Sequence, residues 1–459
     1  MKLKQFIGDR AFYKMTLTVA LPIMLQNFIT NLVSMLDNLM VGALGTEQMS
    51  GVSIVNQLVF IFNLAVFGAM GGIGIFTAQF FGRGDHEGVR YTLRVKIYTA
   101  LLITAAALGV LLAAQEPLIS LFLHDAENTG SVDLTMAFAK EYLAVILLGL
   151  APFAFSQAFA ATLRETGDTF TPMITGVIAV AVNCLFNWLL IFGHLGFPRM
   201  GVRGAAVATV LSRYVELFII VIYAVVKRQR FPYIKGLFRG FSVPGAMLGA
   251  IVRKALPLLC NEILWSAGMS TLSVAYSLHG LSVVAASSIA STVTNLFYIA
   301  FLSLGSSIGI ISGNLLGAGK HEEAVDTVRK LIAFSLTVSV VMGTVLFMVG
   351  GEIPQLYKTS DESKALAAYF IRVCACFSPF VAFTNASYFT LRSGGKTLIT
   401  SVFDSGTLWV FYVPVAFGLF YLFHLPIRTV FPIVQAIELL KVSVAFVLVK
   451  KKVWVKTII

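Results

Sequence analysis

The sequence predicts an all-α integral membrane protein with about twelve transmembrane helices, arranged as two pseudo-symmetric lobes of six helices each. Three observations support this fold class. Of the 459 residues, 58% are hydrophobic and only 12% are charged, about half the charged share of an ordinary soluble domain. Apolar runs of about twenty residues, long enough to cross a bilayer as helices, recur along the whole chain. Finally, landmarks of the first half of the chain recur in the second half.

Each apolar run is expected to be a helix, because lipid offers the backbone no hydrogen-bond partner. The lobes are expected at residues 1–230 and 252–459, joined by a basic linker at residues 231–251. In order along the chain, the predicted spans are 15–42, 51–78, 94–114, 138–161, 171–193, 204–226, 252–277, 282–312, 328–349, 366–389, 398–422 and 428–449.

The basic residues gather on one side of these spans. The chain has a net charge of +12, and its densest basic clusters are Lys227–Arg239 and Lys450–Lys456. Basic segments mark the cytoplasmic side of a membrane protein, so we expect a multi-pass protein with both termini cytoplasmic. Clusters at that surface favour contact with anionic membrane lipids. Their distribution argues against a role in binding nucleic acid.

Three landmarks of the first half recur in the same order in the second half. Matching landmarks lie six spans apart, an even number, so both halves run the same way through the membrane and are related by an axis along its normal. A pathway between two such lobes can open alternately to each side. The pairs are Ala20–Pro22 with Ala255–Pro257, Gly82–Glu87 with Gly317–Glu322, and Thr162–Arg164 with Thr390–Arg392.

Two prolines occupy matching positions in the first span of each half. Pro22 and Pro257 each remove one helix hydrogen bond and favour a bend. We predict that both act as hinges. A static kink is the alternative, because prolines are frequent in membrane helices.

Polar residues near the outer ends of three spans are expected to share one depth in the first lobe. Asp37 lies in the first span, Asn183 and Asn187 lie one turn apart in the fifth, and Thr209 lies in the sixth. A charge inside a bilayer costs about 2.5–3.5 kcal/mol and usually marks a functional residue. Asp37 is therefore the strongest candidate for a functional residue. Carboxylate, amide and hydroxyl oxygens together could hold a proton or Na⁺. The alternatives are a helix-end carboxylate facing water and interhelical asparagine bonds.

The second lobe carries different ionisable groups. Glu262 lies near the middle of span seven, where it would attract a cationic substrate, and Asp404 lies nearer the cytoplasm in span eleven. The repeat places Asn27 opposite Glu262 and Gln157 opposite Asn385, so these polar groups could line the same cavity. Hydrogen bonding between helices is an equally good interpretation of the amides.

Two further pairs of charges lie three residues apart on one helix. Arg213 with Glu216, and Glu438 with Lys441, have the spacing at which neighbouring side chains neutralise each other. We expect both to be structural ion pairs. Arg372 has no local partner of this kind.

Nothing in the sequence predicts an enzyme. No phosphate-binding loop is present, and the six histidines form no metal-ligand pair at helical spacing. We therefore expect no cofactor and no metal beyond the coupling ion.

Taken together, these motifs resemble the multidrug and toxic compound extrusion (MATE) family of bacterial transporters over essentially the whole chain. The motifs that carry the resemblance are Leu21-Pro22 followed fifteen residues later by Asp37, the loop Gly82–Glu87, Leu163–Thr169, and the pair Asn183 and Asn187. The resemblance implies H⁺- or Na⁺-coupled export of cationic or amphipathic drugs through a cleft between two lobes. It places the first-helix acidic residue of the family at Asp37 and the second-lobe acidic residue at Glu262.

One branch of the family has an aspartate at the position of Asn187, so the complete site of that branch is not expected here. Small organic cations are the expected substrates, and a monomer is the expected state. A lipid-linked oligosaccharide flippase of the related superfamily, or an exporter of one metabolite, are the alternatives.

Overall fold

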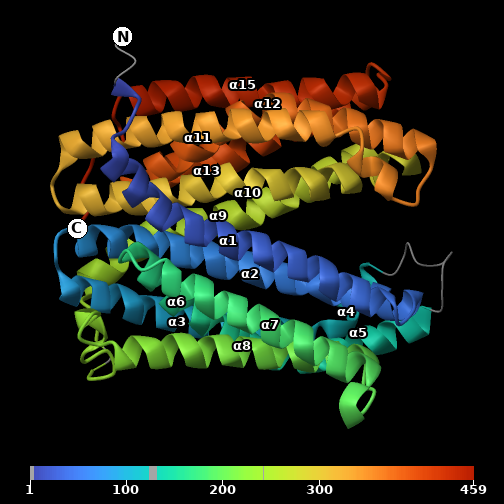
Figure 1. Cartoon of the computed structure of the whole chain (residues 1–459), viewed down its shortest axis with the longest axis horizontal. Helices are drawn as coiled ribbons and strands as arrows, with labels where there is room; N and C mark the ends of the chain where they lie inside the picture. The colour runs from blue at the N-terminus through green and yellow to red at the C-terminus, as the bar shows by residue number, and fades with distance from the viewer. Residues whose placement is uncertain (1–4, 123–131, 241) are drawn as a thin grey trace. The chain divides into compact units, whose positions relative to one another are not determined.

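The computed structural model describes residues 5–122, 132–240 and 242–459. Long helices joined by short connections make up almost all of these residues (Figure 1). The first half contains α1 (Arg10–Gly42), α2 (Thr46–Gly82), α3 (His86–Ala113), the short α4 (Gln115–Ser120), α5 (Val132–Ile146), α6 (Leu150–Glu165), α7 (Phe170–Phe192) and α8 (Gly201–Val226). The second half contains α9 (Gly245–Ser277), α10 (Leu281–Gly317), α11 (His321–Val349), α12 (Asp361–Ser393), α13 (Thr397–Ser401), α14 (Val413–Tyr421) and α15 (Ile427–Lys450).

Shorter segments complete some of the spans. The 3₁₀ turn η3 (Leu147–Gly149) joins α5 to α6 into one span, and two π-helical segments, η7 (Val402–Gly406) and η8 (Leu408–Tyr412), join α13 to α14. The 3₁₀ turns η4 (His194–Gly196), η5 (Pro232–Ile234) and η6 (Ile353–Leu356) lie in connections between helices.

The expected membrane fold is confirmed. Eleven of the helices in the described part of the chain are long and apolar enough to cross a membrane. The remaining expected span, 252–277, is also a helix, α9, which is 33 residues long but carries Arg253, Lys254 and Glu262. Most helices extend several residues beyond the apolar runs, because their polar ends continue the helix past the hydrophobic stretch.

Contacts between residues divide the chain into two compact units. The N-terminal unit comprises Leu25–Thr77 and His86–Ile251, and the C-terminal unit comprises Met1–Met24, Ala78–Asp85 and Val252–Ile459. This division differs in three segments from the lobes expected at 1–230 and 252–459. The start of α1 and the end of α2 belong to the C-terminal unit, and the linker 231–251 belongs to the N-terminal unit.

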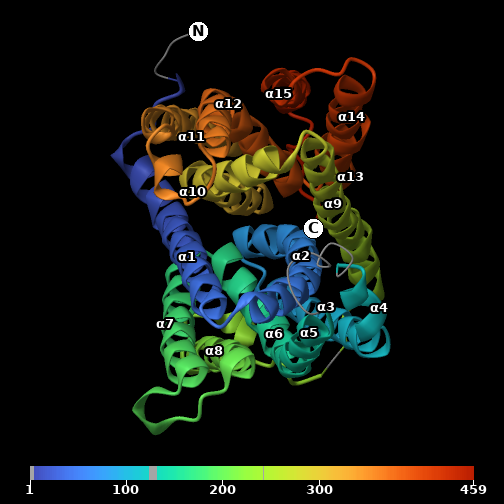
Figure 2. The same ribbon diagram turned by 90° about the vertical axis from the view of Figure 1, so that its right-hand side faces the viewer.

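Each unit has an apolar core between its helices. In the N-terminal unit, α7 runs beside α8, and α6 packs on both α3 and α8. In the C-terminal unit, α12 packs on α10, α11 and α15, and Figure 2 shows α12 lying beside α10 and α11. Large side chains such as Phe62 and Phe153 are buried in the first core, and Phe370 and Phe431 stack in the second.

The basic linker is docked on the N-terminal unit rather than extended. The buried guanidinium of Arg94 in α3 donates to the carbonyl oxygens of Gly236 (2.8 Å) and Leu237 (3.0 Å). The side chain of Tyr233 is 1% exposed, and its hydroxyl lies 2.9 Å from the Thr166 hydroxyl at the end of α6. Backbone carbonyl groups of a loop usually accept hydrogen bonds from water. Here Arg94 donates those bonds instead, and it thereby anchors the linker to this unit.

The residues after α15 dock on the C-terminal unit in a comparable way. Trp454 is 1% exposed. The buried Gln79 side chain of α2 donates to the carbonyl oxygens of Ser393 (2.9 Å) and Lys456 (3.2 Å) and accepts from the Ile458 N–H (2.8 Å). These bonds place the end of α2 in the C-terminal unit. In each half, the segment after the sixth span therefore buries large aromatic side chains, Phe231 and Tyr233 in the first and Trp454 in the second.

The repeated loops share one backbone geometry. Gly84 and Gly319 have φ angles of 78° and 74°, and Gly167 and Gly395 have φ angles of 87° and 72°. In all four loops the glycine N–H donates to the carbonyl three residues back, and the next N–H donates to the carbonyl five residues back. This is the Schellman arrangement that ends a helix with a left-handed residue. The sequence repeat thus corresponds to a repeat of helix ends.

A second pair of repeated glycines lies where two helices touch. A Cβ on Gly82, at the end of α2, would overlap the backbone of Asn314 in α10, and a Cβ on Gly317, at the end of α10, would overlap the backbone of Gln79. These glycines let the two backbones approach each other closely within the C-terminal unit.

We predict that alanine substitutions at Gly84 and Gly82 distinguish two energetic costs, that of a left-handed residue and that of moving two packed helices apart. Gly84→Ala should destabilise the protein by about 1–2 kcal/mol, the cost of a left-handed residue, because a Cβ there meets nothing within 4 Å. Gly82→Ala should destabilise it more, because two helices must move apart. The midpoint of thermal unfolding in detergent, followed by the monodisperse fraction on a sizing column, measures both.

Gly109→Ala is the matched control. Gly109 lies inside α3 with right-handed backbone angles, and a Cβ there also meets nothing within 4 Å. This variant should be as stable as the parent or slightly more stable, because alanine favours a helix over glycine by about 0.5–1 kcal/mol. A Gly84→Ala protein as stable as Gly109→Ala would contradict the role given to the left-handed cap.

Candidate functional site

The N-terminal unit contains a cavity of about 560 Å³ lined by α1, α2, α6, α7 and α8. Its lining is unusually polar for a chain of this composition. The polar and charged residues along it include Gln26, Asn27, Asp37, Asn63, Gln157, Arg164, Asn183, Thr209, Arg213 and Glu216.

Four residues expected to share one depth form a connected chain of hydrogen bonds. The Asn187 amide donates to Asp37 Oδ1 at 2.6 Å and to Asn183 Oδ1 at 3.3 Å, and the Asn183 amide donates to the Thr209 hydroxyl at 3.2 Å. Asn187 is 1% exposed and Asn183 is 6% exposed. Because these residues come from α1, α7 and α8, the chain of bonds ties three helices together beside the cavity.

The same cavity contains two arginines. Arg213 forms the expected ion pair with Glu216, at 3.9 Å, and lies 4.4 Å from the centre of the Phe153 ring. Arg164 donates to the Gln26 side chain at 3.3 Å. The sequence marked Arg164 only as part of a repeated motif, and nothing in the local pattern pointed to Gln26.

The C-terminal unit contains a second cavity, of about 520 Å³, lined by α9, α10, α12, α15 and the two π-helical segments. Three carboxylates and two basic groups reach it from Glu262, Asp404, Glu438, Arg392 and Lys441. Aromatic rings make up much of the remaining wall, from Trp265, Tyr276, Tyr298, Tyr388, Phe389, Phe403 and Tyr412. Glu262 is half-buried beside these rings.

The expected ion pair between Glu438 and Lys441 is wrong for this structure. Lys441 Nζ instead lies 3.2 Å from Asp404 Oδ1, and the Asn261 amide donates to Asp404 Oδ2 at 3.2 Å. Glu438 accepts hydrogen bonds from the hydroxyls of Thr384 and Tyr412. The spacing on α15 allows the expected pair, but the packing of η7 against α15 offers Lys441 a carboxylate from a neighbouring helix.

The repeat-related polar positions are divided between the two cavities. Asn27 and Gln157 line the cavity of the N-terminal unit, whereas Glu262 and Asn385 line that of the C-terminal unit. The arginines of the repeated Thr-Leu-Arg motif are divided in the same way: Arg164 lines the N-terminal cavity and Arg392 lines the C-terminal one. Corresponding positions therefore line corresponding cavities, one in each unit.

The remaining singled-out residues lie outside these hydrogen-bond networks. Pro22 lies within α1 and Pro257 within α9, and both helices continue past their proline. The carbonyl oxygen of Pro257 accepts from the Ser401 hydroxyl at 2.8 Å. Arg372 lies 5.9 Å from the centre of the Phe347 ring.

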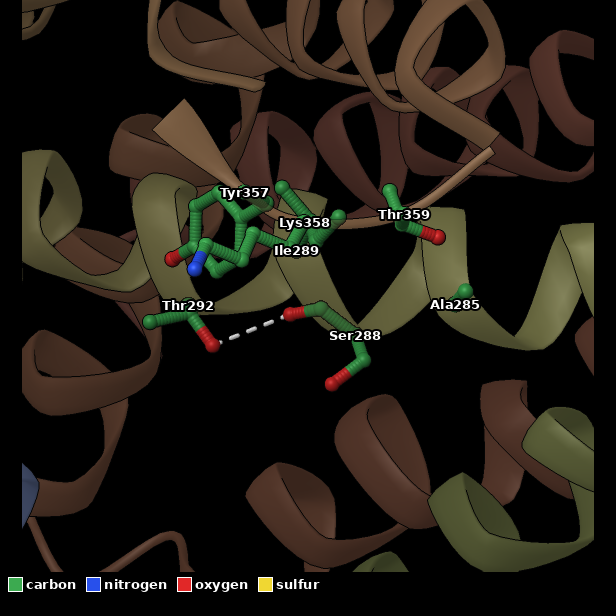
Figure 3. Close-up of a pocket in the computed structure, with 7 residues that line it drawn as sticks. All are labelled: Ala285, Ser288, Ile289, Thr292, Tyr357, Lys358 and Thr359. Carbon is green, nitrogen blue, oxygen red and sulfur yellow. Dashed lines mark hydrogen bonds between the residues drawn. The ribbon is translucent and has the colours of Figure 1, made fainter. Parts of the chain in front are cut away.

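A third, smaller cavity lies between α10 and the connection after η6. It measures about 260 Å³ and is lined by Ala285, Ser288, Ile289, Thr292, Tyr357, Lys358 and Thr359. Figure 3 shows the Thr292 hydroxyl turned back to the carbonyl oxygen of Ser288, at 2.9 Å. No residue predicted to be functional lines this cavity.

Among the described residues, no group of three or more His, Cys, Asp or Glu side chains is placed to hold a metal ion. The four cysteines are free thiols. Asp37 in the N-terminal unit is accompanied by amides and a hydroxyl, and the three carboxylates of the C-terminal cavity are accompanied by two basic groups and by hydroxyls. This donor set suits a proton, a monovalent cation or an organic cation better than a divalent metal.

Comparisons with known proteins agree with the fold. The MatE family model matches residues 22–189 and 257–417. A probable multidrug resistance protein NorM of Thermotoga maritima is 29% identical over 415 residues, covering 90% of this chain and 86% of that protein. The multidrug resistance protein PmpM of Pseudomonas aeruginosa is 26% identical over 411 residues, covering 89% and 84%.

Two solved structures share the fold. An outward-facing multidrug resistance MATE transporter of the MOP superfamily superposes with a TM-score of 0.86 at 21% identity, over 98% of this chain and 97% of that one. A MOP superfamily transporter from Pyrococcus furiosus gives a TM-score of 0.83 at 20% identity, over 99% and 98%. With the family model matching both halves of the repeat, the chain belongs to the MatE family, whose members are membrane transporters and not enzymes.

Proposed function

We propose that this protein is a cation-coupled exporter of small organic cations that works by alternating access. The observation that carries the proposal is Asp37, a carboxylate inside a membrane helix that accepts a 2.6 Å hydrogen bond from Asn187 beside a polar cavity. Relatives named for multidrug resistance support drugs as the substrates. The coupling ion is H⁺ or Na⁺, and no cofactor takes part.

The hydrogen bonds that connect Asp37 to Thr209 through Asn187 and Asn183 suit an ion that binds and is released again. An ionised Asp37 is stabilised by the Asn187 amide, and a bound proton or Na⁺ replaces part of that stabilisation. The oxygens of Asp37, Asn183 and Thr209 could contribute to a Na⁺ site. Because Asn187 and Thr209 belong to α7 and α8, a change at Asp37 changes how α1 is held against both helices. Bending at Pro22 and Pro257 would accompany that change.

The C-terminal cavity suits the organic cation. Glu262 supplies a negative charge, and aromatic faces such as those of Trp265, Tyr388 and Phe389 attract cations by about 0.5–2 kcal/mol each. A flippase for anionic lipid-linked sugars is less well supported, because Glu262 would repel such a headgroup. Coupling then requires that the ion and the substrate differ in affinity between the two states of the transporter.

The distribution of charge supports an orientation. The connection after α8 carries Lys227, Arg228, Arg230, Lys235 and Arg239, and the end of α15 with the segment after it carries Lys450, Lys451, Lys452 and Lys456. Basic connections of this kind face the cytoplasm. We propose a monomer in the bacterial plasma membrane, with both termini cytoplasmic and anionic lipids around the basic segments.

Asp37→Asn is predicted to abolish gradient-driven efflux, because an amide cannot bind and release the coupling ion. Reconstituted vesicles with H⁺ and Na⁺ gradients imposed separately, and ethidium as the transported dye, measure the effect. In the parent protein the coupling ion should change dye affinity by about 5–150-fold, the usual range of coupling between two sites. In Asp37→Asn the part of that change that comes from the Asp37 site should disappear.

Asp361→Asn is the control, because Asp361 is fully exposed at the start of α12. It should transport like the parent protein. Undiminished ion-driven efflux by Asp37→Asn would refute the proposed coupling site.

Glu262→Gln is predicted to weaken the binding of ethidium about tenfold or more, which corresponds to a loss of about 1.4 kcal/mol. An uncharged aromatic dye should bind the parent and the variant equally, because the aromatic wall is unchanged. Fluorescence titration of the purified proteins measures both affinities. Equal losses for charged and uncharged dyes would show that Glu262 supports the cavity and does not select a cation.

A further inference from the structure

A second group of titratable side chains lies on the far wall of the C-terminal cavity, where α15 meets η7 and η8. We call Asp404, Glu438 and Lys441, with the hydroxyls of Tyr412 and Thr384, the α15 cluster. All five residues line the cavity. Glu438 is 7% exposed, and the side chains of Lys441 and Asp404 are 14% and 24% exposed.

The helix that faces α15 is irregular at this place. Val402–Gly406 and Leu408–Tyr412 are both π-helical, and these segments carry Asp404 and Tyr412. A π-turn widens the helix, costs stability and is found frequently at functional sites. In this protein the two π-turns bring one carboxylate and one phenol to successive turns of α15.

The cluster contains more negative than positive charge. Lys441 neutralises Asp404 at 3.2 Å. Glu438 takes part in no ion pair within 4.0 Å among the described residues, and it is held by the Tyr412 hydroxyl at 2.5 Å and by the Thr384 hydroxyl. An uncompensated carboxylate is costly in a bilayer. The cluster therefore needs one further cation.

The hydroxyl of Thr384 allows that cation to be a proton. It lies 3.0 Å from the carbonyl oxygen of Val381 as well as against Glu438 Oε1. Beside an ionised Glu438 it donates to the carboxylate. Beside a protonated Glu438 it can donate to Val381 and accept the carboxyl proton, so every hydrogen bond is satisfied in both states. Na⁺ would need several more oxygen ligands than these groups supply.

We propose that Glu438 is a proton-binding site of the C-terminal unit, and that Lys441 exchanges between Asp404 and Glu438 as the proton binds and leaves. Glu438 and Lys441 lie three residues apart on α15, so their side chains can meet without any movement of the helix. With the proton bound, Lys441 pairs with Asp404. With the proton released, Lys441 turns to Glu438, and Asp404 becomes free to hold a cation from the cavity.

Proton and organic cation thereby compete for one excess negative charge in this cavity. Only the identity of that second cation rests on the proposed function; the proton site does not. The other charged or titratable groups facing the cluster are Glu262 and Tyr276 of α9, Tyr298 of α10, and Tyr388 and Arg392 of α12. Glu262 and Arg392 carry opposite charges, so they leave the charge balance unchanged.

The test counts protonated carboxyl groups by infrared difference spectroscopy of the purified protein in detergent, near neutral pH and without substrate. Glu438→Gln should remove one protonated carboxyl, because the negative charge of Asp404 is then neutralised by the positive charge of Lys441. Asp404→Asn should also remove one, because Lys441 then pairs with Glu438. Lys441→Gln should add one, because two carboxylates then lack a counter-ion. Each variant is first shown to be monodisperse.

Glu323→Gln is the matched control, since Glu323 is an exposed partner of Lys320 on α11, and it should leave the count unchanged. An unchanged count in Glu438→Gln or in Lys441→Gln would overturn the proposal. Should Glu438→Gln fail to fold, the opposite changes expected for Asp404→Asn and Lys441→Gln still decide it.

A second measurement adds ethidium to the unbuffered protein and follows proton release with a pH indicator. Asp37→Asn should still release a proton from the C-terminal cavity, whereas the double variant Asp37→Asn/Glu438→Gln should release none. Release that persists in the double variant would contradict the competition. A failure of Asp37→Asn to lose coupled efflux would affect the proposed function and leave the carboxyl count intact.

Discussion

Hydrocarbon offers no hydrogen bonds, so each polar group that this chain carries into its helical bundle must find a partner within the protein. Lys96 shows the constraint most clearly. It is 0% exposed within α3, and it pairs with Glu165 and donates to the Thr162 hydroxyl at 3.0 Å. The same constraint binds Asn187 to Asp37 and Lys441 to Asp404. The polar networks of both cavities are therefore parts of the packing as well as candidate sites.

The repeat explains why there are two cavities and why they differ. Duplication placed the same helix ends, the same Schellman glycines and the same Thr-Leu-Arg motif in both halves. It also placed polar groups at corresponding positions, such as Asn27 and Glu262. The chemistry of the two cavities differs: the N-terminal cavity contains Asp37, which accepts from the Asn187 amide, together with Glu216 and two arginines, whereas the C-terminal cavity contains three carboxylates with aromatic walls. A transporter that must bind two unlike cations can use such a difference.

The segments that follow the sixth span of each half do more than connect helices, because each is packed against one of the two units. The linker is fastened by Arg94 and Tyr233, and the final residues are fastened by Gln79 and Trp454. Both segments were expected to be basic, and their charged side chains are largely exposed. Their backbones and aromatic side chains nevertheless take part in the packing of the unit to which they return.

The sequence by itself determined the membrane class, the positions of the spans to within about eight residues, and the meeting of Asp37 with Asn183, Asn187 and Thr209. These follow from hydropathy and from depth along helices that must cross a layer of known thickness. Only the tertiary structure decided that Lys441 pairs with Asp404, that Arg164 and Gln26 share a cavity, and that Gln79 holds the end of the chain. Such contacts join side chains on different helices, far apart in sequence, and depend on how each helix is rotated about its axis. Spacing along one helix can show which partners are within reach, but it cannot show which of them the packing selects.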